Sequence, residues 1–220
     1  MNTIIIIGEG QTEQEFCNGV LQPFFNKKNI YLYNPTIKKS NGGIVPWKEL
    51  KKEIILHLKN PTAIVTTLID YYGIHPRHDF PKWKEYEKTI DISARMNLLE
   101  EAMKKDIPDK VRYRFIPYIQ LHEFECLLFS DISVIKDHFD DSEFKNYNYL
   151  LETSKQYPNP EDINNGSDTA PSKRLGNILE NYDKVVYGSL LAQEIGLDTI
   201  RKKCPRFNVW IENLLSTSRC

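Results

Sequence analysis

Four stretches of the chain are rich in hydrophobic residues that are β-branched or aromatic, and each predicts a β-strand. They cover residues 3–8, 30–37, 62–73 and 111–121. In the first and third stretches the apolar residues are continuous, which is typical of strands that are buried on both faces of a parallel sheet. The sequence therefore predicts a sheet whose central strands are covered by helices on both sides.

Three helices are predicted between these strands. The first begins near Glu13, because Thr12 and Glu15 match a capping box, and Pro23 should kink or end it. The other two cover residues 47–59 and 92–105. Because strands and helices alternate, we expect an α/β fold with a mostly parallel sheet flanked by helices.

The pattern changes after residue 130. Residues 157–175 are dense in Pro, Asn, Asp, Gly and Ser, and this segment is too long to be a simple linker. Further helices are predicted at residues 172–182 and 205–215. We expect residues 1–130 to form the α/β core, and residues 131–220 to form a helical extension packed on it as part of a single structural unit.

Composition and charge narrow the possible functions. The 29 basic and 30 acidic residues nearly cancel, so a contact with nucleic acid would need a local basic patch. The longest apolar runs are far shorter than the ~20 residues of a membrane span. The four cysteines show no CxxC spacing. These features predict a soluble, cytoplasmic protein with no membrane partner. The chain also lacks the G-x-G-x-x-G and P-loop motifs of nucleotide-binding α/β proteins and the G-x-S-x-G motif of Ser-His-Asp hydrolases.

Three of the predicted strands end in carboxylates. Glu9 follows the first strand, Asp70 lies near the end of the third, and Glu123 and Glu125 follow the fourth. Ligands bind beyond the carboxyl ends of parallel strands, so we expect these acids to converge in one pocket. Carboxylates that lie close together repel each other, and a divalent cation such as Mg²⁺ or Mn²⁺ removes that penalty. All four acids are therefore candidate metal ligands.

The segment HEFE, residues 122–125, leaves two arrangements open. If it is extended, Glu123 and Glu125 lie on the same face. If it is already helical, the two acids diverge to opposite flanks, and His122 lies nearer to Glu125. We favour Glu125 with His122 beside it, and we keep Glu123 as the alternative.

Five motifs, GEGQTEQEF, TTLIDYYG, YIQLHEFECLLFSD, TAPSKRL and IGLDTIRKKCPRFNVWIENL, occur in this order along nearly the whole chain. Together they resemble a bacterial family, domain of unknown function 4276, which is related to the Toprim domains of OLD-type nucleases. The resemblance implies a Toprim-like α/β fold and an acidic site that depends on Mg²⁺.

The resemblance also implies roles for individual residues. Glu9 matches a glutamate that acts in acid/base chemistry or metal binding, and Asp70 matches the first aspartate of an Asp-x-Asp metal motif. Tyr72 stands where that motif has its second aspartate. The candidates to replace the missing ligand are Asp79, Glu123 and Glu125. Otherwise the site binds one ion, or none productively.

Further candidates lie outside the acidic strand ends. Lys173 is a candidate catalytic cation that stabilises developing charge, and Arg174 is a candidate substrate-binding residue. Ser172 is a candidate N-cap, and its helix would add a dipole to a phosphate site. The other candidate substrate-binding residues are Gly10, Arg77, His78 and His122.

Two functions fit these features. The first is a Mg²⁺-dependent (or Mn²⁺-dependent) nuclease or phosphotransfer enzyme that acts on DNA or RNA, with Glu9, Asp70, Glu125 and Lys173 as catalytic residues. Related families act in defence against phage or plasmids beside an ATPase, and the resemblance extends that expectation to this chain. The second is a non-catalytic Toprim-like subunit that binds an ATPase partner.

Overall fold

Parallel strands in the order β2-β1-β3-β4 form the central sheet of the computed structural model, which describes residues 2–38, 43–164, 166 and 168–218. A fifth strand, β5, pairs with the end of β3. The bounds of the strands are Asn2–Gly8 (β1), Ile30–Tyr33 (β2), Ala63–Asp70 (β3), Phe115–Ile116 (β4) and Ile119–Gln120 (β5). Every pairing between these strands is parallel, so the predicted α/β fold is confirmed.

Three of the four predicted strands are shorter than their hydrophobic runs. The second ends at Tyr33, and the chain rejoins the sheet only through a bridge between Thr36 and Gly8. The fourth is interrupted at Pro117, which has no N–H to donate to a strand ladder and separates β4 from β5. The third strand ends at Asp70, and a 3₁₀ turn, η2 (Tyr71–Gly73), follows it.

The first predicted helix begins earlier than expected and does not end at Pro23. It starts at Gln11, because the Glu13 carboxylate accepts the N–H of Gly10 and caps this end (Oε2–N 2.8 Å). The predicted capping box of Thr12 and Glu15 is therefore wrong. The helical run continues from α1 (Gln11–Phe16) through a π-turn, η1 (Cys17–Leu21), into α2 (Gln22–Asn26). Pro23 lies in the first turn of α2, shortly after the π-turn. The helical run ends at Asn26.

The crossover helices agree with the hydrophobic pattern. Helix α3 (Trp47–Leu58) connects towards β3, and α5 (Ile92–Lys105) connects towards β4, as predicted. Two short helices, α4 (Trp83–Tyr86) and α6 (Asp109–Arg112), flank α5. A 3₁₀ turn, η3 (Pro76–His78), lies in the loop after β3.

The second part of the chain contains more helices than the sequence predicts. Helix α12 (Pro205–Thr217) confirms one prediction, and α9 (Pro171–Ile178) confirms the other but ends four residues early. The unpredicted helices are α7 (Ile132–His138), α8 (Tyr147–Gln156), α10 (Lys184–Ile195) and α11 (Leu197–Lys203). The 3₁₀ elements of this part are η4 (Phe124–Ser130), η5 (Asp141–Glu143) and η6 (Pro160–Asp162).

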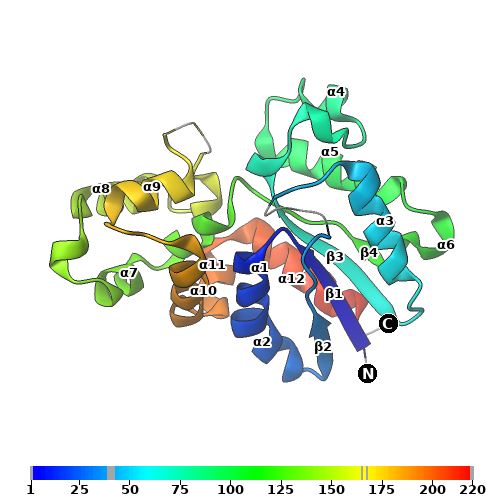
Figure 1. Cartoon of the computed structure of the whole chain (residues 1–220), viewed down its shortest axis with the longest axis horizontal. Coiled ribbons are helices and arrows are strands. Elements are labelled where there is room, and N and C mark those ends of the chain that lie inside the picture. Colours follow the sequence, from blue (N-terminus) through cyan, green and yellow to red (C-terminus); the bar gives the residue numbers. More distant parts are fainter. Residues whose placement is uncertain (1, 39–42, 165, 167, 219–220) are drawn as a thin grey trace.

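Both faces of the sheet are covered, as continuous apolar strands require. On one face, Ile5 and Ile7 pack with residues of α3 and α5. On the other face, Ile4 and Ile6 belong to a cluster that also includes α1, η4, α10 and α12. Figure 1 shows α10 and α12 beside α1 and β1, whereas α7 to α9 lie on the opposite side of the molecule from α3 to α6.

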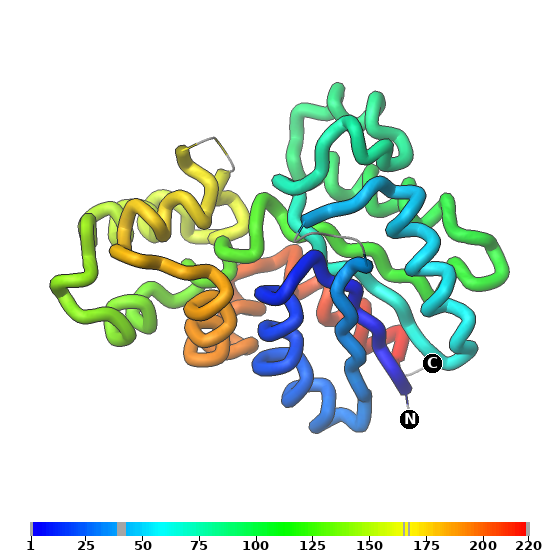
Figure 2. Tube along the Cα trace, in the orientation of Figure 1, coloured from blue at the N-terminus to red at the C-terminus, as the bar shows by residue number. Residues whose placement is uncertain are grey.

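The last helix is attached directly to the central strand. The indole of Trp210 donates to the Thr66 hydroxyl of β3 (Nε1–Oγ1 2.9 Å) and stacks on Tyr118 at 4.5 Å between ring centroids. The side chain of Asn2 donates to the carbonyl of Ser218, so the start of β1 and the end of α12 lie side by side (Figure 2). Residues after 130 therefore share one hydrophobic core with the strands.

Replacing Trp210 by Ala should strongly destabilise the protein. The side chain is 2% exposed, and its loss removes a ring from the core and leaves Thr66 without its indole donor. We expect the free energy of unfolding to fall by about 3–5 kcal/mol in chemical denaturation. Val209→Ala, one position away on α12 and 57% exposed, is the control and should change it by less than about 0.5 kcal/mol. Equal effects would contradict this account.

Candidate functional site

Gly8, which precedes Glu9, makes room for a second glutamate. A Cβ at Gly8 would lie 3.0 Å from Cβ of Glu13, and the N–H of Gly10 is the group that the Glu13 carboxylate caps. Glu9 itself reaches across to the next strand, where its Oε1 accepts the N–H of Asp70 at 2.7 Å. This hydrogen bond joins the ends of β1 and β3.

The chain after β5 contacts the end of β3 through a residue with left-handed backbone, His122. His122 has φ +62°, and its carbonyl accepts the N–H of Tyr72, 3.0 Å away, in the turn after β3. Glu123 is extended, and its Oε2 accepts the N–H of Ser172 at the start of α9 (2.9 Å). Glu125 follows in the first turn of η4.

The segment HEFE therefore adopts neither of the two arrangements considered for it. Its first half is not a regular strand, because His122 is left-handed, and a 3₁₀ helix starts at Phe124. Even so, the charges of both Glu123 and Glu125 act on Asp70. The structure thus brings both acids towards the end of β3.

Burial and repulsion between carboxylates raise the pKa values of Glu9, Asp70 and Glu125. Burial raises the pKa of Glu9 to about 8, and the Glu13 charge adds to that rise. The pKa of Asp70 lies well above its ordinary value, because of burial first and then the charges of Glu9 and Glu13. Burial raises the pKa of Glu125 to about 7, with a further contribution from Glu123. We call these five residues, Glu9, Glu13, Asp70, Glu123 and Glu125, the acidic cluster.

Lys184 is a cation that acts on this cluster. It is exposed at the start of α10, and its charge lowers the pKa values of Glu9, Glu13 and Glu125. Burial lowers the pKa of Lys184 itself, but the carboxylates, Glu125 foremost, outweigh that effect and raise it. Lys184 therefore compensates part of the negative charge.

The sequence analysis missed Glu13 and Lys184. A local signal for Glu13 existed, since an acid three residues after a glycine N-cap is a common helix start. Lys184 has no such signal, because the packing of α10 against α1 and η4 brings it near acids that lie far from it in the sequence.

The cluster has the donor chemistry of a site for a hard divalent cation, since its ligands would be carboxylate oxygens. Oε1 of Glu125, a residue that is only 2% exposed, is buried and has no hydrogen-bond partner among the described residues. Within that same part of the chain, however, no three His, Cys, Asp or Glu side chains form a ready-made metal site. Holding an ion would therefore require the carboxylates to turn towards one another.

A pocket of about 350 Å³ opens beside Glu9. It is lined by Glu9, Gly10, Gln11, Gln14, Glu15, Thr36 and Ile37. Gln14 is fixed there, because its side chain donates to the carbonyl of Asn34 and the Asn34 side chain donates to the Gln14 carbonyl. Gly10, a predicted substrate-binding residue, thus lies in a pocket that adjoins the acidic cluster.

Two predicted residues, Arg77 and His78, bond within their own loop. His78 Nδ1 accepts the N–H of His75 (3.1 Å), and Nε of Arg77 lies 3.4 Å from His78 Nε2. Burial, and then the charge of Arg77, lowers the pKa of His78. Asp79, a candidate replacement ligand, is exposed at a left-handed position with φ +50°.

Arg174 is buried between α8 and α9. Its guanidinium donates to the carbonyl of Thr169 and to the hydroxyls of Tyr149 and Thr153, at 2.9, 2.9 and 3.2 Å. These bonds hold α9 against α8, whereas Lys173 beside it is exposed.

The predicted N-cap at Ser172 is wrong. Ala170 occupies that position, and the N–H of Ser172 lies inside the first turn of α9, where it binds Glu123. An internal carboxylate therefore already interacts with the helix end that the sequence analysis assigned to a phosphate.

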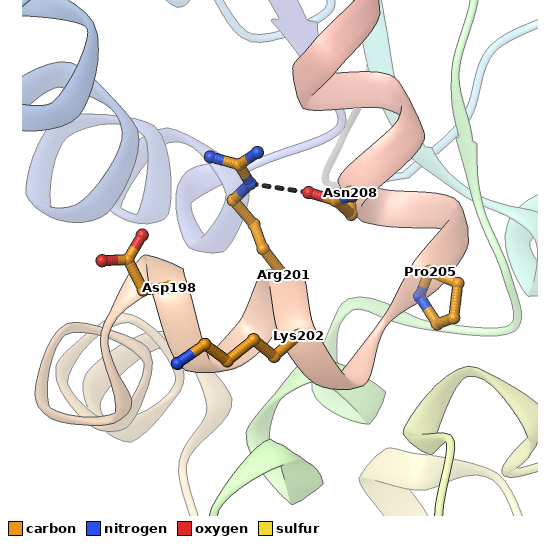
Figure 3. A pocket seen from close by; sticks show the side chains of 5 residues that line it. All are labelled: Asp198, Arg201, Lys202, Pro205 and Asn208. Atoms are coloured by element: carbon orange, nitrogen blue, oxygen red, sulfur yellow. Dashed lines mark hydrogen bonds between the residues drawn. The ribbon is translucent and has the colours of Figure 1, made fainter.

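A larger pocket, of about 550 Å³, lies elsewhere, between α11 and α12 (Figure 3). Its lining residues are Asp198, Arg201, Lys202, Pro205 and Asn208, and Arg201 Nε donates to Asn208 Oδ1 at 2.7 Å. None of these residues belongs to the acidic cluster.

The fold and the site define an α/β protein with an acidic cluster at the carboxyl ends of the strands of a parallel sheet. The model of a family called domain of unknown function, DUF4276, matches residues 8–215, and the chain belongs to that family. No curated protein and no solved structure matches the chain. No helix in the described part of the chain has the length and apolar character that a membrane crossing requires.

Stability should fall as pH rises through neutrality when no divalent cation is present. The pKa values of Glu9 and Glu125 rise from 4.5 to about 8 and about 7, so the folded state binds more protons than the unfolded chain between these values. The free energy of unfolding therefore decreases from about pH 4.5 to 8 and levels off above that range. Urea denaturation between pH 5 and 9 measures this slope.

Glu9→Gln should make the slope shallower, because an amide carries no charge at any pH in this range. Glu152→Gln, on the exposed surface of α8, is the matched control and should leave the slope unchanged. A slope that is identical in wild type and Glu9→Gln would show that Glu9 is not buried in the way described.

Proposed function

We propose that this protein is a Mg²⁺-dependent nuclease, or a related phosphotransfer enzyme, that acts on DNA or RNA. The observation that carries the proposal is the convergence of Glu9, Asp70 and Glu125 from the ends of three strands into one electrostatically coupled cluster. Perturbed carboxylates in such a position are typical of functional sites. The carboxyl edge of a parallel sheet is also where α/β proteins bind their ligands.

Glu9 and Asp70 would hold the Mg²⁺ or Mn²⁺ ion, with Glu125 and Glu123 beside them. A bound ion of this kind polarises a phosphoryl oxygen and lowers the pKa of a water molecule. It would also relieve the repulsion that raises the pKa values of the acids. This is a physical reason for a protein to keep so many carboxylates together.

Lys184 would contact the negatively charged phosphate of the substrate. It is exposed, it lies close enough to the acids to change their pKa values, and its ammonium is a strong hydrogen-bond donor. Lys173, the cation that the sequence suggested, lies one residue after Ser172, whose N–H binds Glu123, and it remains a second candidate.

A relation to Toprim nucleases and a role in defence beside an ATPase are part of the proposal. The order of a glutamate after the first strand and an aspartate at the end of the third supports the relation to Toprim domains. Tyr72, which is 43% exposed where the Asp-x-Asp motif has its second acid, supports a site for one ion rather than two.

The same tyrosine favours one alternative function. A chain that lacks the second aspartate could keep the fold and lose the chemistry, and its role would then be to bind an ATPase partner as a non-catalytic subunit. Cleavage assays distinguish these two functions, because only the enzyme cleaves nucleic acid in a reaction that depends on Glu9 and Asp70.

Glu9→Gln and Asp70→Asn should each abolish cleavage of plasmid, linear DNA or RNA in the presence of Mg²⁺ or Mn²⁺. Each change removes a charge that the proposed ion needs, and we expect a rate loss of at least about 100-fold. Binding of Mg²⁺ to the wild type should also raise its free energy of unfolding, by about 2.7 kcal/mol at 100 times the dissociation constant, and this gain should vanish in Asp70→Asn.

Asp137→Asn, an exposed aspartate on α7, is the control for both measurements. Circular dichroism should show that all three variants are folded. Cleavage that survives in both Glu9→Gln and Asp70→Asn would refute the proposed function.

The two candidate lysines can be distinguished by parallel substitutions. If Lys184 contacts the phosphate, Lys184→Ala should lower the cleavage rate on the order of 100-fold, whereas Lys173→Ala should change it only slightly. Rates measured at saturating Mg²⁺ and low salt give the comparison. If Lys173→Ala lowered the rate more than Lys184→Ala, Lys173 at the start of α9 would be the lysine that contacts the phosphate.

A further inference from the structure

The pocket of about 350 Å³ beside Glu9 is formed by one face of α1 and by the loop after β2. Gln11, Gln14 and Glu15 line it, and their spacing of i, i+3 and i+4 places them on the same face of the helix. Phe16, on the other side of α1, is fully buried in the core. The helix therefore presents three polar side chains to one cavity.

Hydrogen bonds fix the loop that forms the opposite wall of this pocket. The N–H of Gly8 donates to the carbonyl of Pro35 (3.1 Å), and the N–H of Ile37 donates to the carbonyl of Gly8 (2.9 Å). Nε2 of Gln14 donates to the carbonyl of Asn34 at 3.0 Å. Because these bonds attach the loop to both β1 and α1, the pocket is formed before any ligand binds, which favours affinity.

The pocket is rich in hydrogen-bond acceptors. The carboxylate of Glu15 is partly buried and forms no hydrogen bond or ion pair with any described residue. Because Nε2 of Gln14 is bound to Asn34, its Oε1 is a further acceptor. The described lining residues include no Lys, Arg or His. The pocket therefore suits a ligand group that presents N–H donors rather than an anion.

Guanine is the nucleobase whose edge matches these acceptors. Its N1–H and its 2-amino group lie side by side, so the two oxygens of one carboxylate accept both of them. Adenine, cytosine and thymine instead carry an acceptor next to their donor. An isolated amine would fill little of the pocket, whose 350 Å³ falls within the range of about 300–1,000 Å³ for small-molecule sites. Ile37, which is 3% exposed, supplies an apolar wall for a planar ring.

We infer that this pocket binds a guanine base of the nucleic acid and that Glu15 recognises it. The Glu15 carboxylate accepts N1–H and the 2-amino group in charge-assisted hydrogen bonds. The exposed amide of Gln11 donates to O6 of the base. Glu9 belongs both to the pocket and to the acidic cluster, so a base bound here has its sugar and phosphate beside the proposed metal site. The inference rests on the proposed function, because it names the base preference of that reaction.

Guanosine and inosine distinguish a guanine site from a general affinity for nucleosides. Inosine keeps N1–H and O6 and lacks only the 2-amino group, so it offers Glu15 one donor instead of two. Both nucleosides are uncharged, and their binding can be measured in EDTA by saturation-transfer NMR titration. The wild type should bind guanosine about tenfold more tightly than inosine. Equal binding of the two nucleosides, or binding of neither, would overturn the inference.

Glu15→Gln should remove this preference, because an amide presents one acceptor and one donor in place of two acceptors. The variant should bind guanosine and inosine with affinities within about twofold of each other. Glu152→Gln, the same change on the exposed surface of α8, is the matched control and should keep the tenfold preference. A preference that persists in Glu15→Gln would overturn the inference. The comparison in the wild type decides the matter even if Glu15→Gln does not fold.

Cleavage in the presence of Mg²⁺ or Mn²⁺ connects the pocket to the proposed function. A single-stranded oligonucleotide with one guanine in a run of thymines should be cut mainly beside the guanine, and Glu15→Gln should cut it without this preference. A wild type that prefers guanosine but cleaves no nucleic acid would refute the proposed function, and the guanine pocket would stand. A wild type that cleaves nucleic acid but binds guanosine and inosine equally would overturn the guanine pocket alone.

Discussion

The arrangement of the whole molecule depends on β3 being paired on both edges and covered on both faces. In its register with β1 and β5, Leu68 pairs with Gly8 and Asp70 pairs with Gln120. The carboxyl ends of all three strands therefore lie at the same end of the sheet. Parallel pairing alone brings their following residues together. The acidic cluster is a consequence of that register.

Concentrating carboxylates at this edge works against stability, because burial and repulsion both disfavour their ionised forms. The protein offsets part of this effect with backbone donors. The N–H groups of Gly10, Asp70 and Ser172 bind Glu13, Glu9 and Glu123 in turn. Glu125 has no such donor at Oε1 within the described residues, which makes it the acid most open to a ligand.

The helices after residue 130 complete the site rather than merely covering it. Helix α9 supplies the N–H that binds Glu123, and α10 supplies Lys184 and the close contact at Gly188. Helix α12 attaches this half to the sheet, because Trp210 bonds to β3. The charge balance of the cluster therefore depends on both halves of the chain.

The sequence by itself determined the buried strands, the helices α3 and α5, and the acids at the strand ends, because residues next to one another in the chain carry those patterns. It could not determine that Lys184 belongs to the site. Lys184 lies more than 170 residues from Glu9, and only the packing of α10 against α1 and η4 brings it close enough to act on that acid. Local sequence patterns determine where strands, helices and turns form. Which charged groups surround a buried side chain depends instead on which helices and strands pack together in the tertiary structure.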